Sequence, residues 1–242
     1  MLNYKRRIVI TGGTGRFGQV FKNRSDYFNL DFLFPSKKDL NILNVKSINK
    51  YLSRKKPKYL IHLAGLSRPM SLHDKSINES IDKNIIGTAN ITKACSKLKI
   101  KLIYVSTCYV YPGKKGNYKE TDPLLPNNKY AWSKMGGESA VQMYDNSLIL
   151  RVCMTEKPFV HNKAFYDFTT NFIFHDEVAK FLFKLINKRG IINLGGKTQT
   201  VFNFVKKYNP NIKKISAKKI FGSKYPLNPS MNIRKLKKLL ND

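Results

Sequence analysis

The sequence predicts an α/β fold, a doubly wound parallel sheet with a small, reduced C-terminal lobe. Two observations lead to this prediction. Short apolar runs alternate with helical patterns along most of the chain, as buried strands and crossover helices do in a parallel sheet. The first run ends in Gly12-Gly13-Thr14-Gly15-Arg16-Phe17-Gly18, a strand-to-helix turn with three glycines at three-residue intervals. Such a turn marks the ligand crevice of these folds.

The elements follow in order along the chain. The apolar runs predict strands at 8–11, 32–35, 59–64, 102–106, 148–152 and 191–194, and the helical patterns cover 17–23, 45–52, 78–98, 129–144 and 176–186. From Val152 onward the regularity weakens and prolines interrupt it. We therefore expect residues 1–151 to form a dinucleotide-binding domain, to which residues 176–195 return. Residues 152–175 and 196–242 would form the small lobe.

Composition narrows the classes of protein. The chain has 242 residues, and its 45 Lys and Arg against 15 Asp and Glu give a net charge of +30. The lysines are dispersed in pairs and no nucleic-acid recognition motif accompanies them, so we expect no specific nucleic-acid binding. A positive surface would still steer an anionic small ligand toward its site.

No apolar stretch approaches the roughly 20 residues that span a bilayer, and residues 1–7 lack the features of a signal peptide. We therefore expect a cytoplasmic protein without a membrane partner. Cys95, Cys108 and Cys153 have no Cys-x-x-Cys spacing, so neither a disulfide framework nor a metal site is expected.

The glycine turn is suited to a dinucleotide pyrophosphate, because backbone N–H groups at a helix N-terminus bind phosphate. Gly12 allows the tight turn, Gly15 leaves room for the pyrophosphate, and Gly18 lets the helix pack on the strand. The helix start at Arg16 and Phe17 belongs to the same predicted cofactor site. A glycine-rich turn without a ligand is the alternative interpretation of this motif alone.

A second pattern is Tyr130-Ala131-Trp132-Ser133-Lys134. Residues four apart on a helix share one face, and a neighbouring ammonium favours phenolate, so Tyr130 could exchange a proton with a carbonyl or alcohol. Thr107 directly follows the strand from Leu102, at the carboxyl edge where such sheets bind ligands. Its hydroxyl can hold a reacting oxygen. Chance spacing on an amphipathic helix and a simple turn after a strand are the alternatives.

Together these residues carry a family resemblance. The glycine turn, His62-Leu63-Ala64-Gly65, Asn84 to Asn90, Thr107, and Tyr130 with Lys134 occur in the order seen in the extended short-chain dehydrogenase/reductase superfamily. Tyr109-Val110-Tyr111-Pro112-Gly113 and Tyr225-Pro226-Leu227-Asn228-Pro229 resemble its dTDP-4-dehydrorhamnose reductase branch. The resemblance covers nearly the whole chain and implies a Rossmann-type NAD(P)-binding fold.

The resemblance also implies site roles. Tyr130 would be the general acid, Lys134 would tune it and bind the nicotinamide ribose, and Thr107 would orient the keto oxygen. Asn84 would be structural or part of a proton relay. The loop residues Leu63, Ala64 and Gly65 would contact the cofactor, and Cys108, Tyr109 and Arg151 would lie toward the substrate, with a small buried space-filling role as the alternative for Cys108.

The end of the second strand bears on the choice of cofactor. NAD-selective sites place Asp or Glu there, whereas this chain has Ser36 and Lys37, which could receive a 2′-phosphate. We therefore predict NADPH, with NADH or NAD as the open alternative. Asn41 and Ile42 would contact the adenine.

The implied reaction is hydride transfer to the C4 ketone of a nucleotide-linked deoxysugar. Two alternatives stay open: an epimerase or dehydratase that keeps NAD bound, and a non-catalytic regulatory or binding subunit with the same fold. The segment between Arg151 and His175 is shorter than in relatives that hold nucleotide sugars, which favours the subunit. The resemblance also implies a homodimer through the helices at 78–98 and 129–144.

Overall fold

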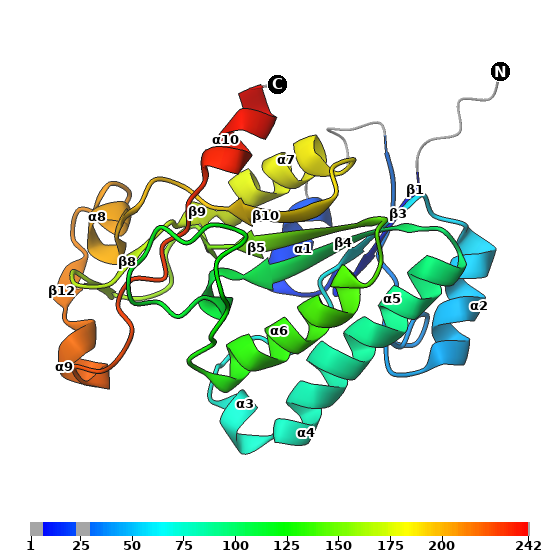
Figure 1. Cartoon of the computed structure of the whole chain (residues 1–242), viewed down its shortest axis with the longest axis horizontal. Helices are drawn as coiled ribbons and strands as arrows, with labels where there is room; N and C mark the ends of the chain where they lie inside the picture. Colours follow the sequence, from blue (N-terminus) through cyan, green and yellow to red (C-terminus); the bar gives the residue numbers. More distant parts are fainter. Residues whose placement is uncertain (1–6, 23–29, 242) are drawn as a thin grey trace. The chain divides into compact units, whose positions relative to one another are not determined.

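A parallel sheet of six strands lies at the centre of the computed structural model, which describes residues 7–22 and 30–241 (Figure 1). The strands are β1 (Arg7–Thr11), β2 (Asp31–Leu33), β3 (Tyr59–His62), β4 (Lys101–Thr107), β5 (Ser147–Val152) and β10 (Gly190–Leu194), in the order β10-β5-β4-β3-β1-β2. All six correspond to predicted strands, so the predicted fold class is confirmed. The predicted helix end at Asn23 and the N-terminal segment 1–6 lie outside the described residues.

The strand order places the ligand crevice. After β2 the chain returns past β1 to form β3 on its other side, and β1 pairs in parallel with both neighbours. Ligands of such sheets bind at the carboxyl ends of the strands where the order reverses. Here those ends are followed by Gly12 and by the loop from Leu63.

The larger helices cover the sheet. α1 (Arg16–Lys22) follows the glycine turn, while α2 (Val45–Lys55), α5 (Gly87–Lys97) and α6 (Lys129–Gln142) pack side by side (Figure 1). Asn44 caps α2, because its side-chain oxygen accepts a hydrogen bond from Ser47 N. The short α3 (Leu72–Lys75), which was not predicted, lies between β3 and α4 in the chain.

The predicted helix at 78–98 is divided in the structure. It consists of α4 (Ile77–Ser80), a π-helical segment (Ile81–Ile86) and α5. The wide turn contains Asn84, whose side chain bonds to groups outside the helix. Insertion of such a residue is a usual cause of π-helical turns, which are frequent at functional sites.

Contacts divide the chain into two compact units. The first comprises residues 1–106, 129–150 and 186–190, and the second comprises 107–128, 151–185 and 191–242. The boundaries differ from those of the predicted domains, because 107–128 and most of the segment predicted to rejoin the first domain, 176–185 and 191–195, group with the second unit.

The second unit is built from short elements around an aromatic core. It contains three pairs of short strands: β6 (Met154–Thr155) with β9 (Ile173–Phe174), β7 (Lys163–Phe165) with β12 (Lys213–Ile215), and β8 (Thr169–Thr170) with β11 (Gln199–Thr200). Its helices are α7 (His175–Leu185), α8 (Val201–Lys206), α9 (Ala217–Phe221) and α10 (Arg234–Asn241). Phe168, Phe174, Phe202 and Phe204 belong to the buried cluster. Among the described helices, none has the length and apolar character needed to cross a membrane.

Candidate active site

The glycine turn after β1 is packed too tightly for side chains. Gly12 has φ of +72°, and a Cβ there would lie 2.6 Å from the backbone nitrogen of Ala64. A Cβ on Gly18 would lie 2.5 Å from the Gly12 carbonyl oxygen. Gly15 N donates to the same oxygen at 3.0 Å, which closes the turn. Because these glycines carry no side chains, the turn has the composition that the approach of a pyrophosphate to a helix N-terminus requires.

The two residues after the turn contribute differently. Phe17 is buried and makes an edge-to-face contact with Phe21, so its side chain belongs to the core. Arg16 is exposed at the first position of α1. The cofactor contact predicted at Phe17 would therefore involve its backbone, and the contact predicted at Arg16 would involve its exposed side chain.

A buried histidine links the loops after β1 and β3. Thr11 Oγ1 lies 2.8 Å from His62 Nδ1, and His62 Nε2 lies 3.1 Å from Thr88 Oγ1 on α5. The N–H groups of Leu63 and Ala64 both donate to Thr11 Oγ1 at 3.3 Å. Burial, with the nearby Lys134 charge, lowers the pKa of His62 to about 3. His62 is therefore neutral at pH 7, and its hydrogen bonds join Thr11, at the end of β1, to Thr88 on α5.

This histidine makes stability depend on pH. Because its pKa falls from 6.5 to about 3 on folding, the unfolded chain binds the proton more readily, and stability is lost as pH falls below 6.5. We expect the His62 contribution to fall by about 2 kcal/mol between pH 7 and pH 5. Urea unfolding at both values measures it, with His62→Gln as the comparison. The variant should lose less stability over this interval than the wild type, and equal losses would contradict the neutral state of His62.

The loop after β2 contains a carboxylate that the sequence interpretation did not place there. Asp39 Oδ2 accepts hydrogen bonds from Ser36 N at 3.0 Å and from Ser36 Oγ at 2.7 Å. These two bonds lower the pKa of Asp39, which is therefore charged at neutral pH. The predicted 2′-phosphate donors Ser36 and Lys37 thus lie in the same turn as a negative charge.

The predicted adenine contacts are anchored in the first unit. Asn41 Oδ1 accepts from Leu43 N at 3.0 Å, and Asn90 Nδ2 on α5 donates to the Ile42 carbonyl at 3.1 Å. Both residues are half-buried. The loop is thus fixed against α5 in a defined conformation.

The predicted acid and its lysine lie on α6, followed one turn later by a buried glutamate. Tyr130, Lys134 and Glu138 recur every four residues, so they share one face of the helix. Lys134 Nζ lies 4.1 Å from the centre of the Tyr104 ring. Burial lowers the pKa of Lys134 to about 7, and the Glu138 carboxylate opposes this shift. Ser106 Oγ donates to Glu138 Oε2 at 2.7 Å.

This arrangement poises Lys134 between its two protonation states at neutral pH. In the charged state it can stabilise phenolate on the same helix face and donate to a ligand hydroxyl. Glu138, fully buried, supports that charged state. The stripe therefore has the composition of a proton-exchanging site.

Asn84 connects the loop after β3 with α6. Its Nδ2 group donates to Leu66 O at 2.9 Å and to Ser133 Oγ at 2.8 Å, and its Oδ1 accepts from Leu66 N at 2.7 Å. Ser133 Oγ in turn donates to the Tyr130 carbonyl at 2.8 Å. Of the two roles that the sequence left open, these bonds favour the structural one.

A buried histidine packs against Tyr130. The rings of His73 and Tyr130 have centroids 5.2 Å apart, and His73 Nδ1 lies 2.7 Å from Ser80 Oγ. Burial lowers the pKa of His73, with an opposing effect from the Ser67 carbonyl. His73 Nε2 makes no hydrogen bond of normal geometry with the described part of the chain. The neutral ring supports one side of Tyr130.

The predicted substrate residues belong to the second unit. Thr107 ends β4, and its Oγ1 accepts a 3.3 Å hydrogen bond from Tyr109 N at the start of a short 3₁₀ turn. Cys108 is buried, and Tyr109 packs against the aromatic core of this unit. Thr107 thus has a defined backbone setting, and Cys108 fits the space-filling alternative.

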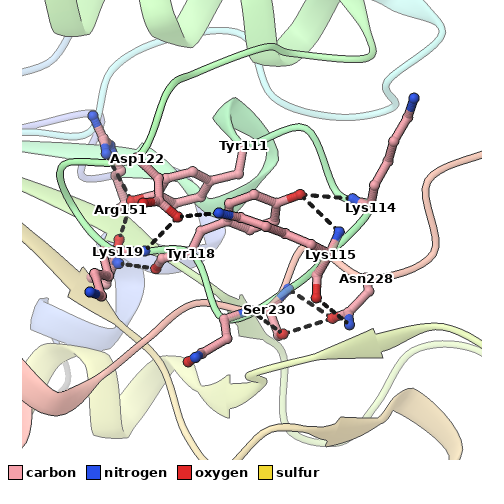
Figure 2. A network of polar contacts seen from close by, with 11 residues as sticks. Tyr111, Lys114, Lys115, Tyr118, Lys119, Asp122, Arg151, Asn228 and Ser230 are labelled. Atoms are coloured by element: carbon pink, nitrogen blue, oxygen red, sulfur yellow. Dashed lines mark hydrogen bonds and ion pairs between the residues drawn. The ribbon is translucent and has the colours of Figure 1, made fainter.

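Arg151 is held in a polar network inside the second unit (Figure 2). Its Nη1 donates to Tyr111 Oη at 2.8 Å and to the Glu120 carbonyl at 3.0 Å. Tyr111 stacks on Tyr118 with centroids 5.0 Å apart, and Tyr118 Oη accepts from the backbone N–H groups of Lys114 and Lys115. Arg151 therefore braces a loop from within, although the sequence placed it toward a substrate.

The structure thus groups the predicted residues in two sets. The first unit brings together the glycine turn, the loops after β2 and β3, Asn84, Tyr130 and Lys134, and the second contains Thr107, Cys108, Tyr109 and Arg151. Sequence reasoning missed Asp39, His73 and Glu138. Only Glu138 had a signal, its four-residue spacing from Lys134. In the described ranges 7–22 and 30–241, no three His, Cys, Asp or Glu side chains form a metal-binding group.

Comparison with protein families gives a match over most of the chain. The model of the family described as RmlD substrate binding domain matches residues 6–165. Methionine adenosyltransferase 2 subunit beta from Xenopus laevis is 31% identical over 155 residues, which are 61% of this chain and 46% of that protein. The dTDP-4-dehydrorhamnose reductase from Aggregatibacter actinomycetemcomitans is 27% identical over 205 residues, 79% of this chain and 63% of that protein. The chain thus spans under two thirds of the length of these relatives.

Solved structures share the fold. The dTDP-4-dehydrorhamnose reductase from Bacillus anthracis in complex with NADP has a TM-score of 0.83 at 22% identity, over 98% of this chain and 93% of that one. The Bordetella bronchiseptica enzyme WbmG in complex with NAD has a TM-score of 0.73 at 17% identity, over 98% and 87%. At these identities the likeness extends to the fold alone.

Proposed function

The chain belongs to the RmlD substrate binding domain family, and on that premise we propose that it is an NADPH-dependent reductase of a 4-keto-deoxysugar nucleotide. The observation that carries the proposal is the stripe of Tyr130, Lys134 and Glu138 on α6, in the same unit as the glycine turn. The stripe on α6 is suited to donate a proton, and the glycine turn is suited to bind a dinucleotide.

The residues present fit a dinucleotide. Gly12 allows the tight turn against the backbone of Ala64, and a Cβ on Gly15 would meet only the Gly12 carbonyl oxygen, at 3.2 Å, so a pyrophosphate can approach the backbone there. The loop from Leu63 to Gly65 and the turn at Asn41 and Ile42 would hold its other parts. Once bound, a reduced nicotinamide supplies the hydride.

The chain's own residues supply the proton and the orientation. Tyr130 donates its phenolic proton to the nascent alkoxide, and the Lys134 ammonium stabilises the phenolate that remains. Glu138 favours the charged form of Lys134. In the same proposal, the Thr107 hydroxyl orients the keto oxygen. Arg151 has a structural role, because its side chain is committed to Tyr111 and Glu120.

The pH dependence of catalysis follows from Lys134. Since its pKa is about 7 in the free protein and the ammonium is the active form, kcat/KM should fall as pH rises above 7. The measurement is a pH profile of kcat/KM for the ketone, with Lys134→Arg as the comparison. Because a guanidinium stays charged, this fall should be absent in the variant, whatever its maximal rate. A fall at the same pH in both proteins would assign it to another group.

Asp39 bears on the choice between NADPH and NADH. Its carboxylate, bonded to Ser36, opposes a 2′-phosphate placed beside Ser36 and Lys37. We expect Asp39→Asn to tighten NADPH binding relative to NADH by up to about fivefold, the scale of an interaction between exposed charges. Fluorescence titration with both cofactors measures the ratio, with Lys37→Ala expected to shift it in the opposite direction. An unchanged ratio in both variants would remove this loop from the recognition of the 2′-phosphate.

A second candidate function is a regulatory subunit. Relatives 31% identical to this chain are named methionine adenosyltransferase 2 subunit beta, and the chain matches only 46% of their length. In that case the fold would bind a dinucleotide and a partner protein without turnover. An epimerase that retains NAD is the other alternative, since the solved structures with this fold include a protein described as a putative epimerase, from Burkholderia cenocepacia.

A substrate panel separates these functions. Purified protein is mixed with NADPH or NADH and several 4-keto-6-deoxy nucleotide sugars, while the loss of reduced-nicotinamide absorbance is followed. We expect NADPH oxidation with at least one member of the panel. Tight NADPH binding without turnover of any of them would favour the regulatory subunit, and NAD that copurifies would favour the epimerase. A cytoplasmic location and a homodimer remain predictions from the resemblance.

A further inference from the structure

Two cysteines meet where neighbouring strands of the sheet end. Cys108 follows the last residue of β4, and Cys153 follows the last residue of β5. β4 and β5 are adjacent in the sheet, and Leu102 N donates to the Asn146 carbonyl at 3.1 Å. By the same register Thr107 lies opposite Val152, so Cys108 and Cys153 each directly follow one of these two opposed residues.

This register suits a bond between the two sulfur atoms. Opposite residues of neighbouring strands lie about 5 Å apart at Cα and project their side chains to the same face, and disulfides join cysteines whose Cα atoms are about 4.4–6.8 Å apart. Both side chains are buried in the second unit, and their thiols are within hydrogen-bond reach of each other.

The two thiols also interact. The hydrogen bond to Cys153, together with burial, raises the pKa of Cys108. Burial alone would raise the pKa of Cys153, but the hydrogen bonds from Cys108, Thr170 and the backbone N–H of Asn171 more than offset it and lower that pKa. Cys153 Sγ lies 2.7 Å from Thr170 Oγ1. The hydrogen bond from Cys108 therefore favours the thiolate form at Cys153, which makes Cys153 the attacking sulfur of the pair.

We propose that Cys108 and Cys153 form an oxidisable dithiol, which a hydroperoxide converts to an intramolecular disulfide. The Cys153 thiolate attacks one peroxide oxygen, which breaks the O–O bond and gives a sulfenic acid and hydroxide. The Cys108 sulfur then attacks the sulfenic sulfur, the S–S bond forms, and the hydroxyl leaves as water with the Cys108 proton. Two sulfurs are oxidised, one peroxide is reduced, and a solvent proton neutralises the hydroxide.

The third cysteine supplies a matched control. Cys95 is as deeply buried as the pair but lies on α5 in the first unit, and burial raises its pKa. Cys95 is thus as buried as Cys108 and Cys153, but it has no second cysteine beside it and its thiolate form is not favoured. Cys95→Ser should therefore leave the oxidation of the other two unchanged.

The test counts thiols in the full chain. Wild type, Cys95→Ser, Cys108→Ser and Cys153→Ser are treated with excess hydrogen peroxide for a time that fully oxidises added glutathione. Each is then denatured, titrated with a thiol reagent and mapped by mass spectrometry. We expect wild type to lose two of its three thiols and to yield one linked pair of peptides containing Cys108 and Cys153. Cys95→Ser should yield the same pair, and the other two variants none.

Three results would overturn the proposal: retention of all thiols in wild type, a linkage that includes Cys95, or a linkage between two chains. The peptide map of wild type decides the question even if a serine variant does not fold. A second readout rests on the proposed function: because Cys108 directly follows Thr107, turnover should fall with disulfide formation and return with dithiothreitol. Disulfide formation without an effect on turnover would support the proposed dithiol and would count against the proposed role of Thr107.

Discussion

Tyr130→Phe is expected to lower kcat by about 10²- to 10⁴-fold, the usual contribution of a positioned general acid. The substitution removes one oxygen and keeps the ring, so the contact with His73 at 5.2 Å between centroids is preserved. Cofactor affinity should change little, because the glycine turn and the loop after β3 are unaltered. Steady-state rates and a fluorescence titration with NADPH measure the two quantities separately.

The matched control is Tyr208→Phe, at an exposed position of the second unit. It removes the same oxygen and should leave the rate within about twofold, as a surface substitution away from the site does. A Tyr130→Phe protein that reduces the ketone at the rate of Tyr208→Phe would show that the proton comes from another group.

The second large effect is expected at Gly12. In Gly12→Ala, the left-handed backbone costs about 1–2 kcal/mol, and the methyl group 2.6 Å from Ala64 N adds about 1–3 kcal/mol of overpacking. The same methyl group displaces the loop after β3, so dinucleotide affinity should fall at least tenfold. Urea unfolding and NADPH titration measure the two losses.

Gly190 provides an unusually close comparison. Its φ is +78°, nearly that of Gly12, yet a Cβ there would meet nothing within 4 Å. Gly190→Ala should therefore lose only the backbone contribution of about 1–2 kcal/mol and keep NADPH affinity. Equal losses in the two variants would show that backbone strain, and not the close approach of the β3 loop, makes Gly12 necessary.

The sheet could be predicted from sequence for a physical reason. Strands that are buried on both faces have continuous apolar sequences. All six apolar runs in the sequence correspond to strands of one parallel sheet. The second unit could not be predicted in this way. Its strands are two or three residues long, too short to establish a period, and aromatic packing holds them together.

The sequence could indicate a residue of the candidate site where its proposed role depends on local spacing. The Tyr130 to Lys134 interval and the glycine turn are local, whereas Asp39 acts through a turn that returns its carboxylate to Ser36. The π-helical segment around Asn84 depends on Leu66 and Ser133, both distant in sequence. The Cys108 and Cys153 pair arises only from strand register. Contacts set by the fold leave no pattern along the chain.

The most direct test of the proposed reaction follows the hydride itself. Protein, a 4-keto-6-deoxy nucleotide sugar and NADPH deuterated at C4 of the nicotinamide are incubated, and the sugar product is examined by mass spectrometry and NMR. We expect one deuterium at C4 of the product with NADPH labelled on one face of the nicotinamide, none with NADPH labelled on the other face, and loss of this transfer in Tyr130→Phe. Tight binding of NADPH with no deuterium in any sugar of the panel would contradict it.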